Sequence, residues 1–308
     1  MFIEQVYKNR ANLVSYLPFP LGLFGLMSLN YFVSANADMD VAHLIKEEIL
    51  KKGKSAFFIE NLIPFAILLA LLFMWVKFIH RQSIRSLTTA RKEIDWHRVF
   101  FSFCVWGGIS ALLVLFSYLS SPENFIFNFR LIPFLELSLI CLILVPLQTS
   151  FEEYFFRGYL MQGIGVATKR KWVALLCTSV VFGMMHLANP EVEKMGLFLM
   201  VYYIGTGALL GIMTLMDDGL ELSIGFHAAN NIVGALLVTS DWTVFQTDSV
   251  LIDISKPSVS FDVILPVVII FPILLFIFSK KYHWSGWKEK LTGKVAIPSP
   301  DPNQISSK

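Results

Sequence analysis

The sequence predicts an all-α fold, a polytopic membrane helix bundle of about eight transmembrane helices. Hydrophobic residues make up 55% of the 308 residues, charged residues only 16%, and the mean hydropathy is +0.62. A soluble domain carries about 25% charged residues. Apolar runs of about 20 residues, the length that crosses a bilayer, recur along the whole chain. Composition and patterning therefore indicate an integral membrane protein.

The apolar runs define the spans, and the spans define three regions. We expect spans over residues 13–34, 57–79, 99–119, 131–160, 172–189, 196–216, 221–240 and 262–279. The first two and their polar connection form an N-terminal membrane region, 1–94. The next five form a helix bundle, 95–240, and the last span continues into a tail, 241–308.

Three segments differ from a simple span or short connection. The connection 35–56 is polar and long enough for a short helix. The fourth span, 131–160, is long enough to be one tilted helix or a span followed by a second helix. The tail 281–308 ends in a proline-rich stretch, which predicts disorder.

Lysine and arginine predict the orientation, because cytoplasmic loops are enriched in them. With eight spans, both termini share one side. That side receives 16 Lys and Arg residues and the other side receives 7. We therefore expect a multi-pass protein with both termini in the cytoplasm.

Other classes of function have little support in the sequence. The three cysteines show neither metal-ligand spacing nor a disulfide framework. No basic run contains the interleaved aromatic residues typical of nucleic-acid binding. We expect a lipid bilayer and membrane-associated molecules as partners, and no nucleic acid.

Ionisable residues at membrane depth identify the candidate site. Glu152, Glu153 and Arg157 lie in the fourth span, and each costs about 2.5–3.5 kcal/mol to insert. Glu153 and Arg157 are spaced i, i+4, which predicts an intrahelical ion pair that supports the site. That pairing leaves Glu152 without a local partner. Asp217 and Asp218, before the seventh span, are expected to be solvated.

Two later spans carry polar residues at a similar depth. A helix rises 1.5 Å per residue, which puts Glu152 about 17 Å, His186 about 22 Å, His227 about 9 Å and Asn231 about 15 Å from the cytoplasmic ends of their helices. Within the error of helix tilt these residues share one layer. Taken singly, each has another explanation as a hydrogen-bonding residue between packed helices. Together they predict a buried hydrolytic site.

The residue types fit peptide hydrolysis. A buried glutamate can take a proton from water, and a histidine can share that proton or hold the water. His227 and Asn231 are one turn apart, so both can donate to one developing oxyanion. Gly-x-Ser-x-Gly and His-Glu-x-x-His motifs are absent from the sequence.

Zinc is an alternative. Glu152, His186 and His227 would make a three-ligand catalytic site, as in a metalloprotease. We favour a metal-independent mechanism, because Asn231 is a poor zinc ligand and a good hydrogen-bond donor.

Three motifs in order carry a resemblance. Glu-Glu-x-x-x-Arg (152–157), Phe-x-x-x-His (182–186) and His-x-x-x-Asn (227–231) resemble the motifs of the CAAX protease and bacteriocin-processing family, intramembrane endopeptidases related to the type II CAAX prenyl endopeptidase. The resemblance covers about 95–240. It implies an eight-helix core with its site recessed from the cytoplasmic side.

The resemblance also implies roles for the residues. Glu152 would activate water with His186 beside it, and His227 and Asn231 would stabilise the oxyanion. The substrate would be a prenylated CAAX-type peptide or another membrane-associated peptide. The alternatives are a non-catalytic scaffold, an immunity or regulatory protein of the same fold, and a transporter with a proton relay.

Overall fold

The computed structural model describes residues 1–8, 13–36, 41–257 and 263–296. The α-helices are α1 (Pro18–Asn36), α2 (Val41–Lys52), α3 (Lys54–Met74), α4 (Ile84–Thr88), α5 (Trp96–Ser120), α6 (Leu131–Glu153), α7 (Met161–Thr168), α8 (Lys171–Met184), α9 (Pro190–Met195), α10 (Met200–Asp217), α11 (Glu221–Leu237), α12 (Phe271–Lys281) and α13 (Trp287–Thr292). Segments of π-helix cover Trp75–Ile79, Tyr154–Leu160 and Pro266–Ile270, and 3₁₀-helix covers Ile3–Lys8, Leu13–Tyr16, Pro122–Asn124 and Leu197–Leu199.

The predicted all-α fold is confirmed. The described residues hold one small sheet of order β1-β3-β2, in which β1 (Phe125–Phe127) runs antiparallel and β2 (Val238–Thr239) parallel to β3 (Leu251–Asp253). Every predicted span contains helix, and the polar connection after the first span contains α2.

Four of the eight predicted spans coincide with long apolar helices. Within the described part of the chain, four helical stretches are long and apolar enough to cross a bilayer: Lys54–Ile79, Trp96–Ser120, Leu131–Thr168 and Leu197–Asp217. The count of eight spans stays a prediction.

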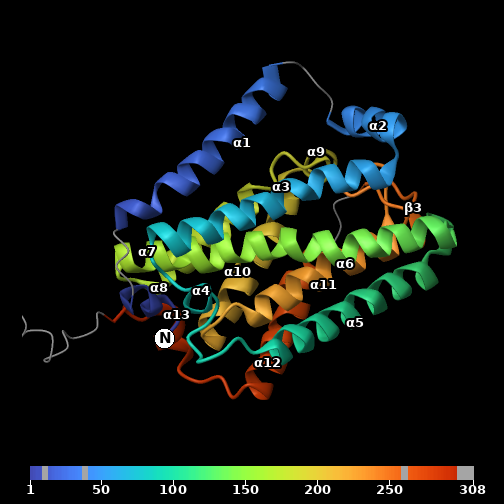
Figure 1. Cartoon of the computed structure of the whole chain (residues 1–308). Coiled ribbons are helices and arrows are strands. Elements are labelled where there is room, and N and C mark those ends of the chain that lie inside the picture. Colours follow the sequence, from blue (N-terminus) through green and yellow to red (C-terminus); the bar gives the residue numbers. More distant parts are fainter. Residues whose placement is uncertain (9–12, 37–40, 258–262, 297–308) are drawn as a thin grey trace, which may run out of the picture.

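The connections between helices gather at two opposite ends of the bundle (Figure 1). At one end, the Phe2 N–H donates to the Asp218 carboxylate (3.0 Å) and the Lys290 ammonium donates to the same group (2.8 Å). At the other end, the Asn128 side chain donates to the Ser249 carbonyl (3.0 Å), beside the small sheet. Successive helices therefore run back and forth between these two ends.

The turn between α10 and α11 corrects one expectation. Asp217 is buried and accepts hydrogen bonds from the side chains of Arg91 (3.1 Å) and Trp284 (3.0 Å). Asp218 adopts a left-handed conformation (φ 55°) and is bound to Lys290. The prediction that both aspartates are solvated is wrong for Asp217, because its partners come from segments far away in the sequence; Asp218 is half-buried.

The C-terminal tail corrects a second expectation, that of disorder over 281–308. Residues 287–292 form α13, and Val295 is buried against the bundle. An isolated β-bridge joins Arg170 to Lys294. The predicted disorder over 281–308 is therefore wrong as far as residue 296. This part of the tail is held in place because Val295 is buried and Lys294 pairs with Arg170. Residues 297–308 lie outside the described part of the chain.

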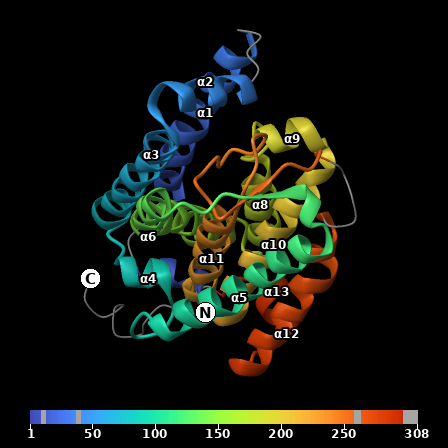
Figure 2. The same cartoon turned by 90° about the vertical axis from the view of Figure 1, so that its right-hand side faces the viewer.

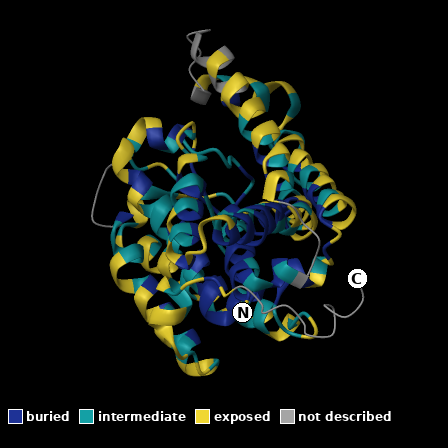
Figure 3. Cartoon of the chain, turned by 90° about the vertical axis from the view of Figure 1, so that its left-hand side faces the viewer, coloured by how far each residue is buried: buried dark blue, intermediate teal, exposed yellow. Residues whose placement is uncertain are grey.

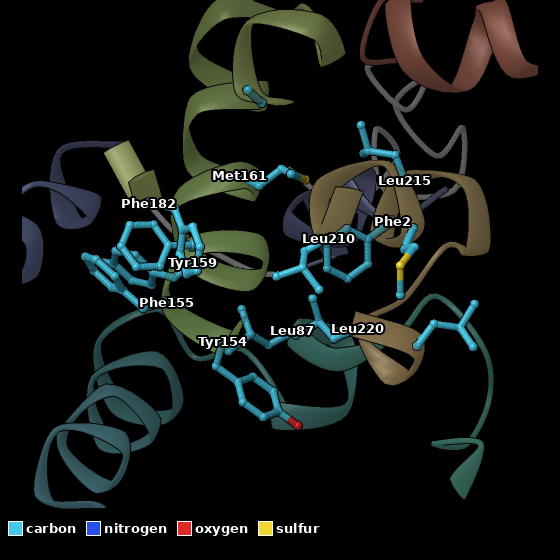
Figure 4. Close-up of a cluster of buried hydrophobic side chains, with 14 of the residues drawn as sticks. Phe2, Leu87, Tyr154, Phe155, Tyr159, Met161, Phe182, Leu210, Leu215 and Leu220 are labelled. Carbon is cyan, nitrogen blue, oxygen red and sulfur yellow. The ribbon is translucent and has the colours of Figure 1, made fainter. Parts of the chain in front are cut away.

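The central element is one continuous helical stretch, Leu131–Thr168, formed by α6, a π-helix and α7. This answers the question that the sequence left open for the fourth span. In the end-on view of Figure 2, α6 lies between α3 and α11, and Figure 3 shows buried ribbon in the middle of the bundle. The six residues 154–159 are all buried, which requires neighbours on every side. Figure 4 shows Tyr154, Phe155 and Tyr159 among the side chains of this core.

Helix α11 packs between α5 and α6. A Cβ at Gly225 would lie 2.1 Å from the Val99 carbonyl oxygen. Glycine at this position therefore allows α11 to approach the α5 backbone closely. The polar face of α11 lies toward α6, where His227 contacts Glu153 and Asn231 contacts Gln148.

Candidate active site

The predicted ion pair between Glu153 and Arg157 is present and lies at the core of the site. Both side chains are fully buried, and the Arg157 guanidinium donates to Glu153 Oε1 at 2.9 Å. The guanidinium also donates to the Gly207 carbonyl at 3.2 Å and lies 4.2 Å from the centre of the Phe182 ring. A Cβ at Gly207 would lie 2.7 Å from the Ser179 carbonyl oxygen, so glycine lets α10 lie against α8 here.

His227 connects the two glutamates. Its Nδ1 lies 2.8 Å from Glu153 Oε1, and its Nε2 lies 3.6 Å from Glu152 Oε2. The carboxylate of Glu153 accepts the Nδ1–H and thereby fixes the orientation of the ring. The Nε2 edge faces Glu152 at a distance slightly longer than a direct hydrogen bond.

Glu152 has a local partner that the sequence reasoning missed. Gln148, one turn earlier on α6, donates to Glu152 Oε1. The carbonyl of the same amide accepts from Asn231 Nδ2 at 3.0 Å. Gln148 thus joins the glutamate of α6 to the asparagine of α11. The i, i+4 spacing of Gln148 and Glu152 was the available signal.

His186 lies at the edge of this group. Its Nδ1 is 2.9 Å from the Phe182 carbonyl oxygen, and its ring stacks on Tyr203 with centroids 4.2 Å apart. Glu152 and His227 are near enough to act on it electrostatically. His227 is the histidine with a measured contact to Glu152, at 3.6 Å, and the placing of His186 beside Glu152 stays a prediction. The depth estimate assumed a helix through residue 189, whereas α8 ends at Met184.

Metal binding is the alternative that the sequence leaves open. In the described ranges, no group of three His, Cys, Asp or Glu side chains is arranged to hold an ion. Each histidine uses its Nδ1 on a protein oxygen, for His227 that of Glu153 and for His186 that of Phe182. Glu152, His186 and His227 are therefore not gathered into a three-ligand group. Each histidine still has Nε2 free as a ligand atom, since a histidine that binds a metal commonly donates its other ring N–H to a protein oxygen, and zinc stays the alternative to the metal-independent mechanism.

The structure thus brings Glu152, Glu153, Arg157, His227 and Asn231 into one group, in which Glu152 and Asn231 are partly exposed and the other three are buried. Side chains of α6 and the π-helix supply two carboxylates and a guanidinium, and α11 supplies an imidazole and an amide. Such a group can activate water beside donors for an oxyanion.

Comparison with known proteins agrees with the motifs. Residues 133–233 match the family model described as type II CAAX prenyl endopeptidase Rce1-like. The resemblance inferred from the three motifs is thereby confirmed, and all six candidate residues lie inside the matched segment. The match points to the CAAX prenyl endopeptidases in general. Together with the apolar helices, it indicates an integral membrane protein.

A bacterial relative shares part of the chain. The uncharacterized protein YyaK of Bacillus subtilis (strain 168) is 32% identical over 171 residues, which is 55% of this chain. The match spans 57% of that relative's length. No solved structure matches the chain significantly.

Proposed function

We propose that this chain, whose residues 133–233 match the type II CAAX prenyl endopeptidases, is an intramembrane endopeptidase that hydrolyses a peptide bond with water activated by Glu152. One observation carries the proposal. His227 contacts Glu153 through one ring nitrogen and faces Glu152 with the other, at 2.8 Å and 3.6 Å. A structural histidine between packed helices has no need for two carboxylates, one of them fully buried.

The charges in the site support Glu152 as the base and Glu153 as the structural partner of Arg157. Glu153 is neutralised by Arg157 within the buried layer, while Glu152 stays available as a base. A proton on His227 would balance the second carboxylate and would give Nε2 a hydrogen to donate. His186 donates Nδ1–H to the Phe182 carbonyl, because a carbonyl only accepts. Its other nitrogen can then hold a water proton.

The reaction follows from these positions. Glu152 takes a proton from water, and the hydroxide attacks the peptide carbonyl carbon. The oxyanion accepts hydrogen bonds from His227 Nε2 and from the second N–H of Asn231; one such donor is worth about 10²–10³ in rate. Glu152 then passes its proton to the leaving amine.

The two ends of the bundle support the predicted orientation. The N-terminal segment, the loop before α5, the α10–α11 turn and α13 meet at one end. Five of the 16 Lys and Arg residues counted on that side lie in the described part of these segments: Lys8, Arg91, Lys92, Lys288 and Lys290. We propose that this end faces the cytoplasm and that the substrate is a membrane-associated or lipidated peptide reaching the site from there.

Cleavage by the purified protein in detergent tests the proposal. A prenylated CAAX-type peptide and the same peptide without the lipid are incubated with protein, and products are identified by mass spectrometry. Glu152→Gln should abolish cleavage while thermal unfolding stays near wild type. Glu136→Gln is the matched control, since Glu136 is exposed on the same helix α6.

The control should retain full activity. Cleavage by Glu152→Gln at the wild-type rate would refute the assignment of the base. Binding of the peptides without cleavage by wild type would favour the scaffold or regulatory alternative.

A further inference from the structure

A chain of hydrogen bonds runs from helix α5 into the site. The Trp106 indole N–H donates to Asn230 Oδ1 at 3.1 Å, and Asn230 Nδ2 donates to Asn231 Oδ1 at 3.1 Å. Asn231 Nδ2 then donates to Gln148 Oε1 at 3.0 Å, and Gln148 Nε2 donates to Glu152. Three amides in series thus connect an indole of α5 to the proposed base.

The two ends of this chain fix its direction. An indole N–H can only donate and an ionised carboxylate can only accept. Every amide between them must therefore present its oxygen toward Trp106 and its nitrogen toward Glu152. Turning one amide over would oppose two donors at one of its contacts and two acceptors at the other, which costs free energy at a buried site.

This direction of the hydrogen bonds leaves one N–H of Asn231 and one oxygen of Glu152 free for the reaction. A primary amide has two N–H groups, and Asn231 uses one of them on Gln148. The other remains available for an oxyanion. Gln148 holds Oε1 of Glu152, so the Oε2 atom that faces His227 remains available for water. Hydrogen bonds in series also polarise one another, which strengthens the chain.

Trp106, at the start of this series of hydrogen bonds, is held rigidly. Trp106 is buried, and its ring stacks on Phe226 with centroids 4.4 Å apart and planes at 25°. A second aromatic ring, that of Phe271, lies 5.8 Å away. The indole therefore cannot turn its N–H elsewhere without repacking this cluster.

We infer that Gln148, Asn230 and Trp106 are positioning residues that set the orientation of Asn231 and Glu152 for catalysis. The inference rests on the proposed function and adds to it a support that reaches from α5 through α11 to α6. None of the three has to touch the substrate.

Steady-state kinetics in detergent test the positioning role of Trp106 and Gln148. Trp106→Phe keeps an aromatic ring and removes the N–H; kcat should fall about 3- to 10-fold with KM unchanged, the loss expected for one buried hydrogen bond. Trp172→Phe, the same change at an exposed position of α8, is the control and should match wild type. Gln148→Met, which removes both bonds at the carboxylate end, should lower kcat about 10- to 100-fold.

A pair of variants at Asn230 tests the direction itself. Asn230→Asp can accept from Trp106 but cannot donate to Asn231, so it forces the amides to turn and sets an oxygen of Gln148 against Glu152. It should therefore lower kcat more than Asn230→Ala, although aspartate is closer to asparagine in shape. Melting temperatures show whether each variant is folded.

The outcomes separate this inference from the proposed function. Cleavage that depends on Glu152 but is unchanged in Trp106→Phe, or equal to wild type in Asn230→Asp, overturns the inference alone. Absence of cleavage by wild type defeats the proposed function and the positioning role with it.

Discussion

Replacing Arg157 by methionine tests how the site tolerates its buried charges. The guanidinium and the Glu153 carboxylate are both fully buried and 2.9 Å apart. Removing one partner of such a pair leaves the other charge uncompensated, at a cost of about 3–5 kcal/mol. At about 1.5 °C per kcal/mol for a chain of this length, the melting temperature should fall by about 5–8 °C. Activity should fall as well, because Glu153 orients His227.

A double variant separates the two effects. Glu153→Leu with Arg157→Met replaces the whole ion pair by apolar side chains of similar size, an exchange that is often neutral or stabilising. Its melting temperature should return toward wild type, while its activity stays low because His227 has lost its acceptor. Thermal unfolding in detergent and peptide cleavage, measured on the same preparations, give both quantities. An Arg157→Met protein that melts with wild type, or a double variant with wild-type activity, would refute the reasoning.

Three further predictions concern the oxyanion donors, the topology and the metal. His227→Ala and Asn231→Ala should be non-additive in log rate, because residues that serve one transition-state group act as a unit; fully additive losses would count against a shared oxyanion site. A reporter active only in the cytoplasm should be active when fused after Lys281 and silent when fused within 243–256; the reverse pair of results would invert the topology. Active protein should retain activity after a strong chelator; stoichiometric zinc by elemental analysis, with activity lost on chelation and restored by zinc, would overturn the metal-independent mechanism.

The sequence predicts those features that depend on local spacing or on composition. Apolar runs locate the helices, and the i, i+4 spacing of Glu153 and Arg157 locates the ion pair. The motifs on three separate helices also suffice to predict the resemblance, which the match over 133–233 confirms.

Features that depend on where one helix lies against another could not be predicted. The partners of Gln148 become evident only once α11 is placed beside α6. The burial of Asp217 depends on Arg91, more than a hundred residues away. The position of His186 depends on where α8 ends, and helix ends are the least predictable part of a hydrophobic run.

The central claim is that Glu152 activates water and forms no covalent bond with the substrate. A single turnover in ¹⁸O-labelled water, followed by mass spectrometry of the peptide products and of the protein, tests it most directly. We predict one labelled oxygen in the new carboxyl group of the product and none in the protein fragment that contains Glu152. Label in the Glu152 fragment would show attack by the carboxylate itself and would contradict the account.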